Sequence, residues 1–449
     1  MREMIPKRWL RTLSFAFASG VVLANVGCAT TGPAPVTPAE IPALRERVIQ
    51  EPGNGAAHLR LGAALLAAER CDAALPVAER GRALLPTDPA GPLIVGQCLE
   101  EEGRFDEALD LYAEFIDANP DAPGVSAVEG RRVIAFKSQA RAVARSAIQN
   151  EENLQTPDPE TVGVLPFLVE GDPTYHPLRV GLANMLTNDL AMIQRFTMVD
   201  RVQIGALLGE LQLPPELVDP ATAAQTGRLL GAGRMVLGTV SIPSEESMRI
   251  GSNIVLGTGE MVEPYSTTGN VGDVLEIEKD LAIRTAEALG YQLTDSEIQE
   301  IRQNVPGSIG AFLSFSRGLM AEDIGDFETA AAYYAEAIRL DPGFGEARQR
   351  LRGATGASVV SEAGAGEATL VGDRADQNLA QATGQDDSSL VGSLLASTLD
   401  SSILDLASHQ AERATEHVGS NEVTEVVGDQ PTLTQAFRAF ILITIVIPR

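Results

Sequence analysis

The stretch Gly103–Ala108 reads GRFDEA, and the stretch Gly325–Ala330, far along the chain, reads GDFETA. In both, a glycine precedes a phenylalanine and an acidic residue, and acidic residues favour the N-terminal end of a helix. Around the first stretch the chain matches itself with an offset of 34 residues, which is the length of two packed helices with their turns. The sequence therefore predicts helical hairpins of one design in two places.

Small residues and prolines mark equivalent positions of this repeat, because glycine and alanine let two helices cross closely and proline ends the second helix. The three copies carry Gly62, Ala74 and Pro86, then Gly96, Ala108 and Pro120, and then Gly318, Ala330 and Pro342. Tyr334 of the third copy corresponds to Tyr112 of the second. This pattern resembles tetratricopeptide repeats, which we expect, with a linking helix, over residues 43–150 and again over 306–352.

Two uses of the repeats remain open. Arrays of this kind hold a peptide on a concave face, but an independent superhelix needs about three repeats. The alternative is that the repeats pack onto the neighbouring domain. Cys71 opens the second helix of one repeat and Cys98 lies late in the next helix, so the two can either form a disulfide or remain small buried side chains.

The N-terminus has the pattern of an export signal, with basic residues before an apolar run from Leu13 to Leu23. The sequence at Gly27-Cys28 resembles a bacterial lipobox, although Asn25 departs from it. We therefore expect a signal peptide at residues 1–27, lipidation of Cys28 and a tether at 28–42. The alternative is cleavage after Ala29, which would release a periplasmic protein.

The central part alternates between helix and strand patterns. Short buried strands are expected near Val162–Phe167, Met235–Ile242 and Met248–Leu256, with helices such as Leu178–Ile193 and Val271–Leu289 between or after them. An α/β sandwich, in which helices cover a sheet, fits this order best.

Several runs in this part resemble the periplasmic domain of the CsgG-like curli-secretion lipoproteins. The runs are Val164–Phe167, Leu186–Leu190, Arg195–Arg201, Gly227–Gly233, Gly238–Val240, Thr258–Glu260 and Leu275–Leu289. The resemblance implies an α/β domain, similar also to the N-terminal domain of TolB, over residues 159–292. It also implies that Asp200-Arg201 is a structural pair and Gly231 a turn glycine, and that the domain binds or assembles proteins.

The chain departs from the curli channels in one respect. Those channels contribute long β-hairpins with strands of about 9–11 residues to a membrane barrel. Here only Pro243–Ser247 separates two adjacent strands, and Pro264 is expected to prevent a further strand after Gly259. A pore formed by this chain alone is therefore disfavoured.

The composition changes after residue 352. Gly, Ala, Ser, Asp and Glu dominate residues 353–430, which are expected to form a mostly disordered, acidic linker. The final segment, 431–449, includes the β-prone run Phe440–Ile447, which is expected to add as a strand to a sheet edge.

Charge and motif content limit the possible functions. A net charge of −27 disfavours nucleic acid as a partner. The basic residues of one predicted helix are expected to be solvated, and they are Arg131, Arg132, Lys137, Arg141 and Arg145. No phosphate-binding loop, metal-ligand spacing or nucleophile motif is found, so we expect no catalytic residue, no metal and no cofactor.

These observations predict an outer-membrane lipoprotein that faces the periplasm and acts as a protein-binding adaptor in envelope assembly or export. Other envelope proteins are the expected partners, the lipid anchor the expected membrane contact, and a homo-oligomer is compatible with this prediction. The alternative is a ring-forming component of a curli-like secretion pore.

Overall fold

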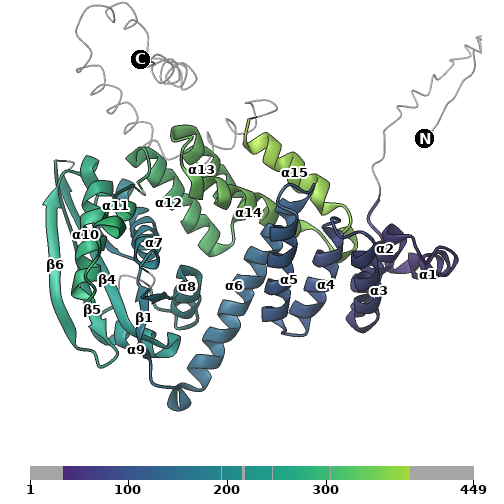
Figure 1. Ribbon diagram of the computed structural model, residues 1–449, viewed down its shortest axis with the longest axis horizontal. Helices are drawn as coiled ribbons and strands as arrows, with labels where there is room; N and C mark the ends of the chain where they lie inside the picture. Colours follow the sequence, from purple (N-terminus) through teal and green to yellow (C-terminus); the bar gives the residue numbers. More distant parts are fainter. Residues whose placement is uncertain (1–33, 194, 215–217, 245, 304, 385–449) are drawn as a thin grey trace, which may run out of the picture. The chain divides into compact units, whose positions relative to one another are not determined.

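The computed structural model describes residues 34–384, except 194, 215–217, 245 and 304 (Figure 1). The predicted signal peptide, the lipidation site Cys28, the part of the linker after residue 384 and the predicted C-terminal strand lie outside the described residues.

The N-terminal repeats form a run of antiparallel helices. Their bounds are η1 (Pro38–Glu40), α1 (Ile41–Gln50), α2 (Gly55–Leu66), α3 (Cys71–Leu84), α4 (Ala90–Glu101), α5 (Phe105–Ala118) and α6 (Val125–Gln149). Asn54 caps α2 by accepting a hydrogen bond from the backbone of Ala57. The helix α6 packs against α5 on one side and α8 of the central domain on the other (Figure 1).

The C-terminal repeat has the same design. It comprises α12 (Ile309–Ile324), α13 (Phe327–Leu340) and α14 (Gly345–Glu362), followed by η6 (Ala365–Glu367) and α15 (Val371–Ala382). Ser308 and Asp326 cap the first two helices through their side chains.

Two boundaries predicted from the sequence were wrong. Residues 353–382, expected to belong to a disordered linker, lie largely in α14, η6 and α15. The small residues that suggested disorder instead allow α14 to approach α6 closely. The predicted tether is ordered from Val36, which is buried and whose backbone N–H donates to the carbonyl of Gly366.

The central domain consists of one mixed sheet and its helices. Its elements are η2 (Glu151–Asn153), β1 (Asp158–Val164), β2 (Leu168–Gly171), η3 (Pro173–Tyr175), α7 (Leu178–Ala191), β3 (Thr197–Met198), α8 (Arg201–Glu210), α9 (Pro220–Leu230), β4 (Ala232–Ser244), β5 (Ser247–Leu256), β6 (Met261–Gly269), η5 (Val271–Asp273), α10 (Val274–Ala288) and α11 (Asp295–Gln303). The strand order is β3-β1-β4-β5-β6, with β2 also paired to β4.

Alternate residues of the strands face two different cores. Val236 and Ile254 face a core shared with α7, α10 and the C-terminal repeat, whereas Met235 and Val255 face a smaller core under α8 and α9. Helices therefore cover both faces of the sheet, and the predicted α/β sandwich flanked by helical repeats is confirmed.

The expectation that no strand follows Gly259 was wrong, because β6 pairs antiparallel with β5. The register shifts between Ser252 and Ile254, opposite the position of Pro264. Of the described strands, β6 pairs only with β5, and proline is tolerated in an edge strand or at a bulge because it lacks the N–H of a ladder bond.

Candidate functional site

The repeat glycines lie where two helices leave no room for a side chain. A Cβ atom on Gly62 would lie 3.2 Å from that of Ala78, and Cβ atoms on Gly96 and Gly318 would overlap the rings of Tyr112 and Tyr334. The repeat alanines Ala74, Ala108 and Ala330 are fully buried. The prolines Pro86, Pro120 and Pro342 each lie two residues beyond the last residue of a helix, namely α3, α5 and α13.

The two repeat tyrosines, Tyr112 and Tyr334, each bind a carboxylate between repeat helices. We call helices α1–α6 the N-terminal module and α12–α14 the C-terminal module. In the N-terminal module, Tyr112 donates from its hydroxyl to Glu100 over 2.7 Å, and Arg131 of α6 donates to both oxygens of Glu100 over 2.9 Å. Burial, reinforced by the Glu100 carboxylate, raises the pKa of Tyr112 well above its ordinary value. The tyrosine therefore stays protonated and remains a donor.

The C-terminal module contains the same set with one addition. Tyr334 donates to Glu322 over 2.7 Å and Arg350 of α14 donates to it over 2.9 Å. Arg201, at the start of α8 in the central domain, lies 3.4 Å from Glu322 and also pairs with Asp323. Lys137 of α6 donates to the backbone carbonyl of Glu322. We call Glu322, Tyr334, Arg350 and Arg201 the junction cluster.

Charge balance explains how these groups are buried together. Burial alone would raise the pKa of Glu322, but Arg350 and Arg201 more than offset it and hold the pKa below its ordinary value. A carboxylate with two guanidinium partners and a hydroxyl donor is satisfied even where little water reaches it. The junction cluster therefore joins the central domain, the C-terminal repeat and, through Lys137, the N-terminal repeats.

Close backbone packing reinforces this junction. A Cβ on Gly181 of α7 would overlap the hydroxyl of Ser316 on α12. Where α6 crosses α14, a Cβ on Gly130 would overlap the backbone of Ala357, and one on Gly356 would overlap that of Ser126. Both crossings require glycine, because any side chain would push the helices apart.

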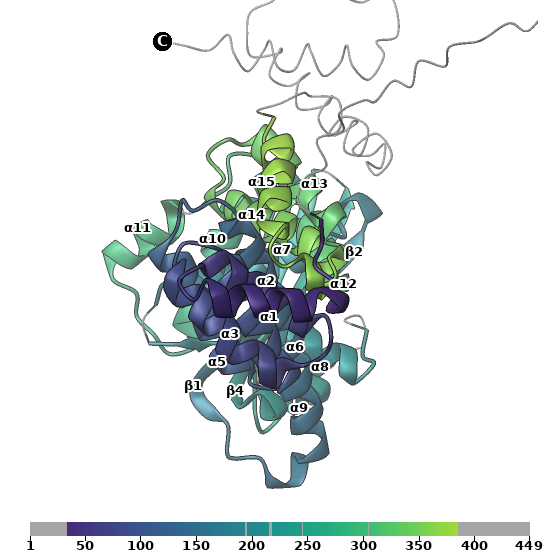
Figure 2. The same cartoon turned by 90° about the vertical axis from the view of Figure 1, so that its right-hand side faces the viewer.

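The chain itself covers the first helices of the N-terminal repeats. Both α2 and α4 are buried along most of their length. Val360, Ala368 and Val371, from α14 to α15, belong to the same hydrophobic cluster as these helices. Asp376 of α15 accepts from the backbone of Gly124 over 2.7 Å. Figure 2 shows α14 and α15 above α1 and α2. This face packs within the chain, so it does not offer an open peptide groove.

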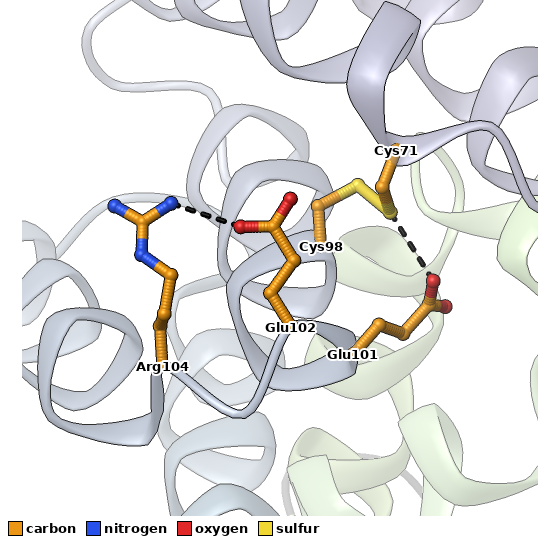
Figure 3. The surroundings of a disulfide bond; sticks show 5 residues. All are labelled: Cys71, Cys98, Glu101, Glu102 and Arg104. Atoms are coloured by element: carbon orange, nitrogen blue, oxygen red, sulfur yellow. Dashed lines mark hydrogen bonds and ion pairs between the residues drawn. A yellow bond between two sulfur atoms is a disulfide. The ribbon is translucent and has the colours of Figure 1, made fainter.

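A disulfide joins Cys71 at the start of α3 to Cys98 in α4, with the two Cα atoms 5.2 Å apart (Figure 3). This separation lies in the usual range for disulfides. The Cys71 sulfur lies 3.2 Å from a carboxylate oxygen of Glu101. The disulfide therefore ties the second helix of the first repeat to the first helix of the second.

The core of the central domain holds a second charged group. Lys279 of α10 donates to Asp189 of α7 over 2.5 Å and lies 3.3 Å from Glu278. All three side chains are buried. Burial, followed by the neighbouring Asp189 charge, raises the pKa of Glu278 well above its ordinary value. Asp189 thus balances the lysine, while burial and the Asp189 charge disfavour the ionised form of Glu278.

The residues implied by the family resemblance have structural roles. Asp200 caps α8 by accepting from the backbone of Val202 over 2.7 Å, while Arg201 points to the junction cluster instead of pairing with its neighbour. Gly231 adopts φ +70° between α9 and β4, a conformation that glycine accommodates without strain.

The expectation that the basic residues of α6 are solvated is right for Arg132, Arg141 and Arg145, which are exposed, although Arg145 also pairs with Glu210. It was wrong for Arg131 and Lys137, which are partly buried and bind Glu100 and the end of α12, respectively. Among the described residues, no group of three or more His, Cys, Asp or Glu side chains could hold a metal ion.

Comparisons with known families agree with this architecture. Residues 163–263 match the family model of the curli production assembly/transport component CsgG. Residues 59–123 and 314–344 match two tetratricopeptide repeat models. The chain thus combines a CsgG-like α/β domain with tetratricopeptide repeats.

Solved structures that resemble the chain include the C-terminal domain of LpoB from Salmonella enterica, at 18% identity and a TM-score of 0.21, covering 29% of this chain and 94% of that chain. The same domain from Escherichia coli matches at 19% identity and a TM-score of 0.21, covering 29% of this chain and 97% of that chain. No curated protein matches the chain.

Sequence reasoning missed the carboxylates at the centre of both repeat modules. A signal was present, because Glu100 and Glu322 each follow a repeat glycine by four residues and precede a repeat tyrosine by twelve. Four residues correspond to about one helical turn, which places the carboxylate on the same face as the glycine. Arg131 and Arg350 lack such a shared spacing.

Proposed function

We propose that this protein is a lipid-anchored envelope adaptor, which holds partner proteins and catalyses no reaction. Support comes from the two kinds of module that it combines, because tetratricopeptide repeats are protein-binding elements and the matched family is named for assembly and transport. In the cell, the modules would bring other envelope proteins together.

The observation that carries the proposal is the junction cluster. Arg201 of the CsgG-like domain and Arg350 of the repeat bind one carboxylate, Glu322. Buried ion pairs tolerate little displacement, because separating them leaves an uncompensated charge. A partner bound to one module would therefore have a fixed position relative to the other, as a scaffold requires.

The anchor is proposed from the N-terminal sequence. An apolar run followed by Gly27-Cys28 supports export and lipidation at Cys28, facing the periplasm from the outer membrane. In the part of the chain that the structure describes, no helix is long and apolar enough to cross a membrane.

Affinity capture from membranes tests the proposal. The full chain with a C-terminal tag would be isolated in mild detergent beside a Cys28→Ser control, with mass spectrometry of the mature N-terminus and of co-purifying proteins. We expect a lipidated Cys28 and a reproducible envelope protein partner, with a monomer or dimer of the chain. Cytosolic, unprocessed protein would refute the anchor. A large homo-oligomeric ring would favour the pore alternative.

A further inference from the structure

The fold holds the chain from a point shortly after the proposed lipidation site. Val36 is buried, and its backbone N–H donates to the carbonyl of Gly366 over 3.0 Å. A Cβ on Gly366 would overlap the carbonyl oxygen of Val36, so a side chain there would push the two segments apart. The position of Val36 is therefore fixed by a part of the chain more than 300 residues further on.

The residues that follow Val36 are fixed as well. Glu40 accepts from the backbone N–H of Thr37 over 3.0 Å at the start of η1. Ile41 and Leu44 of α1 are buried and belong to the hydrophobic cluster of the N-terminal repeats. The chain thus runs from Val36 directly into α1 as part of the folded protein.

The length of chain between Cys28 and Val36 limits how far the protein can lie from its anchor. The two residues are eight positions apart. A fully extended chain advances at most about 3.6 Å per residue, so their Cα atoms are separated by at most about 29 Å. The helix α6, with 25 residues, is about 38 Å long. A lipid on Cys28 would thus hold Val36 closer to the bilayer than the length of one helix of this protein.

The distribution of charge favours membrane contact at the same end. Residues 28–50 carry two arginines and two glutamates, so their net charge is zero. Removal of residues 1–27, which carry a net charge of +3, would change the net charge of the chain from −27 to −30, all of it beyond residue 50. Anionic lipids repel an acidic surface, so the neutral N-terminal end approaches such a bilayer at the lowest cost.

The outer surface of α1 offers side chains that suit a lipid headgroup region. Ile49 is 74% exposed, and Arg45, which is also exposed, lies one helical turn before it. An exposed isoleucine needs no explanation by itself. Beside a bilayer, however, Ile49 can enter the headgroup region while Arg45 pairs with a lipid phosphate. Figure 2 shows α1 in front of α2, and Figure 1 shows α1 and β6 at opposite ends of the described part of the chain.

We propose that the short tether holds the outer surface of α1 against the phospholipid bilayer, with the edge strand β6 of the CsgG-like domain at the end away from the membrane. The inference rests on the proposed lipidation of Cys28 and adds an orientation to it. In this orientation the CsgG-like domain faces proteins in the periplasm, and the N-terminal repeats lie next to lipid.

Photo-labelling from the bilayer tests this orientation. The lipidated full chain is placed in vesicles of equal parts phosphatidylethanolamine and phosphatidylglycerol that contain a phospholipid with a photoactivatable headgroup. Mass spectrometry then maps the labelled peptides. We expect label in α1, and label in β6 no higher than in the unlipidated Cys28→Ser chain. Ile49→Asp should reduce the label in α1, whereas Met261→Asp, at a residue of β6 that is 57% exposed, should leave it unchanged.

Lengthening the tether tests its role directly. Inserting about 60 Gly and Ser residues after Pro33 raises the r.m.s. span of the segment from Cys28 to Val36 from about 16 Å to about 45 Å, so the label in α1 should fall about threefold. Unchanged labelling of α1 in this variant or in Ile49→Asp would overturn the proposal, as would equal labelling of α1 and β6 in the unmodified chain. A lipidated Cys28 with unlabelled α1 would make the orientation wrong but leave the anchor standing. A mature N-terminus without lipid would contradict the anchor itself.

Discussion

The N-terminal and C-terminal repeat modules each contain a hydrogen-bonded tyrosine–glutamate pair, but the two pairs have different structural roles. In the N-terminal module, Glu100 binds Tyr112 and Arg131, and a disulfide links the two repeats. In the C-terminal module, Glu322 binds Tyr334 and Arg350 and also Arg201 from another domain. The charged group of the pair of repeats thus stays within the N-terminal module, whereas that of the single repeat also binds the CsgG-like domain. One motif can therefore serve as an internal brace or as a link between domains.

The largest expected difference is between Glu322→Ala and Glu100→Ala. Removing Glu322 leaves Arg201 and Arg350 without a buried partner, at a cost of about 3–5 kcal/mol of unfolding free energy. Glu100→Ala removes the partner of only one guanidinium, that of Arg131, together with the acceptor of the Tyr112 hydroxyl, and should cost about 1–3 kcal/mol. Urea denaturation measures both, and equal costs would contradict the linking role of the C-terminal repeat.

Reduction should affect mainly the N-terminal module and the parts of α14 and α15 that share its core. Opening the disulfide across its separation of 27 residues should lower stability by about 3 kcal/mol. Denaturation with and without dithiothreitol, with Cys71→Ser/Cys98→Ser as the control that no longer responds, gives the value. Hydrogen exchange should locate the loss mainly in α2–α5, and a loss of protection in α12 and α13 would show that the modules are more strongly coupled than we infer.

The crossing of α6 and α14 should be intolerant of a methyl group. Gly130→Ala overlaps the backbone of Ala357 and should cost about 1–3 kcal/mol. Gly205→Ala is the matched control, because Gly205 also lies within a helix but has nothing within 4 Å of an added Cβ. The control should be neutral or stabilise by about 0.5–1 kcal/mol. A neutral Gly130→Ala would mean that the helices do not cross there.

Removing one hydroxyl gives a finer comparison. Tyr334→Phe and Tyr112→Phe each delete one hydrogen bond to a carboxylate, at about 1 kcal/mol. Tyr334→Phe should cost more, because Glu322 belongs to a larger buried group. Thermal unfolding of both variants decides the order. If Tyr112→Phe costs more, the hydrogen bond to Glu100 contributes more to stability than the hydrogen bond to Glu322.

Acid should weaken the C-terminal module through Glu322. Its pKa is lowered on folding, so its ionised form stabilises the protein above its ordinary pKa of 4.5, and the contribution is lost as the pH falls through the lower folded value. Glu322→Gln should therefore show a smaller loss of stability than the unmodified protein as the pH is lowered below 4.5. Parallel curves would show that other carboxylates govern acid unfolding.

Much of the fold could be predicted because its signals are local. The glycine, alanine and proline spacing placed the repeats, and alternating apolar residues placed β4 and β5. Predictions from the sequence pattern were wrong where contacts between distant elements determine the structure. Gly353–Ala357 has the composition of a disordered segment but forms a helix that packs against α6. Pro264 is typical of a strand end, but it lies in an edge strand, where proline is tolerated. The junction cluster was missed because Arg201 and Glu322 lie far apart in the chain.

The sequence by itself determined the order of the modules, the type of most helices and strands, and the tyrosines that fill the repeat cores. These depend on periodicity and on side-chain size along a few turns of chain. Only the tertiary structure decided that Arg201 reaches Glu322, that Lys279 balances Asp189 in the buried core, and that α14 and α15 cover the first repeat helices. The physical reason is that burial and charge pairing depend on neighbours brought together from distant parts of the chain, which no local pattern specifies.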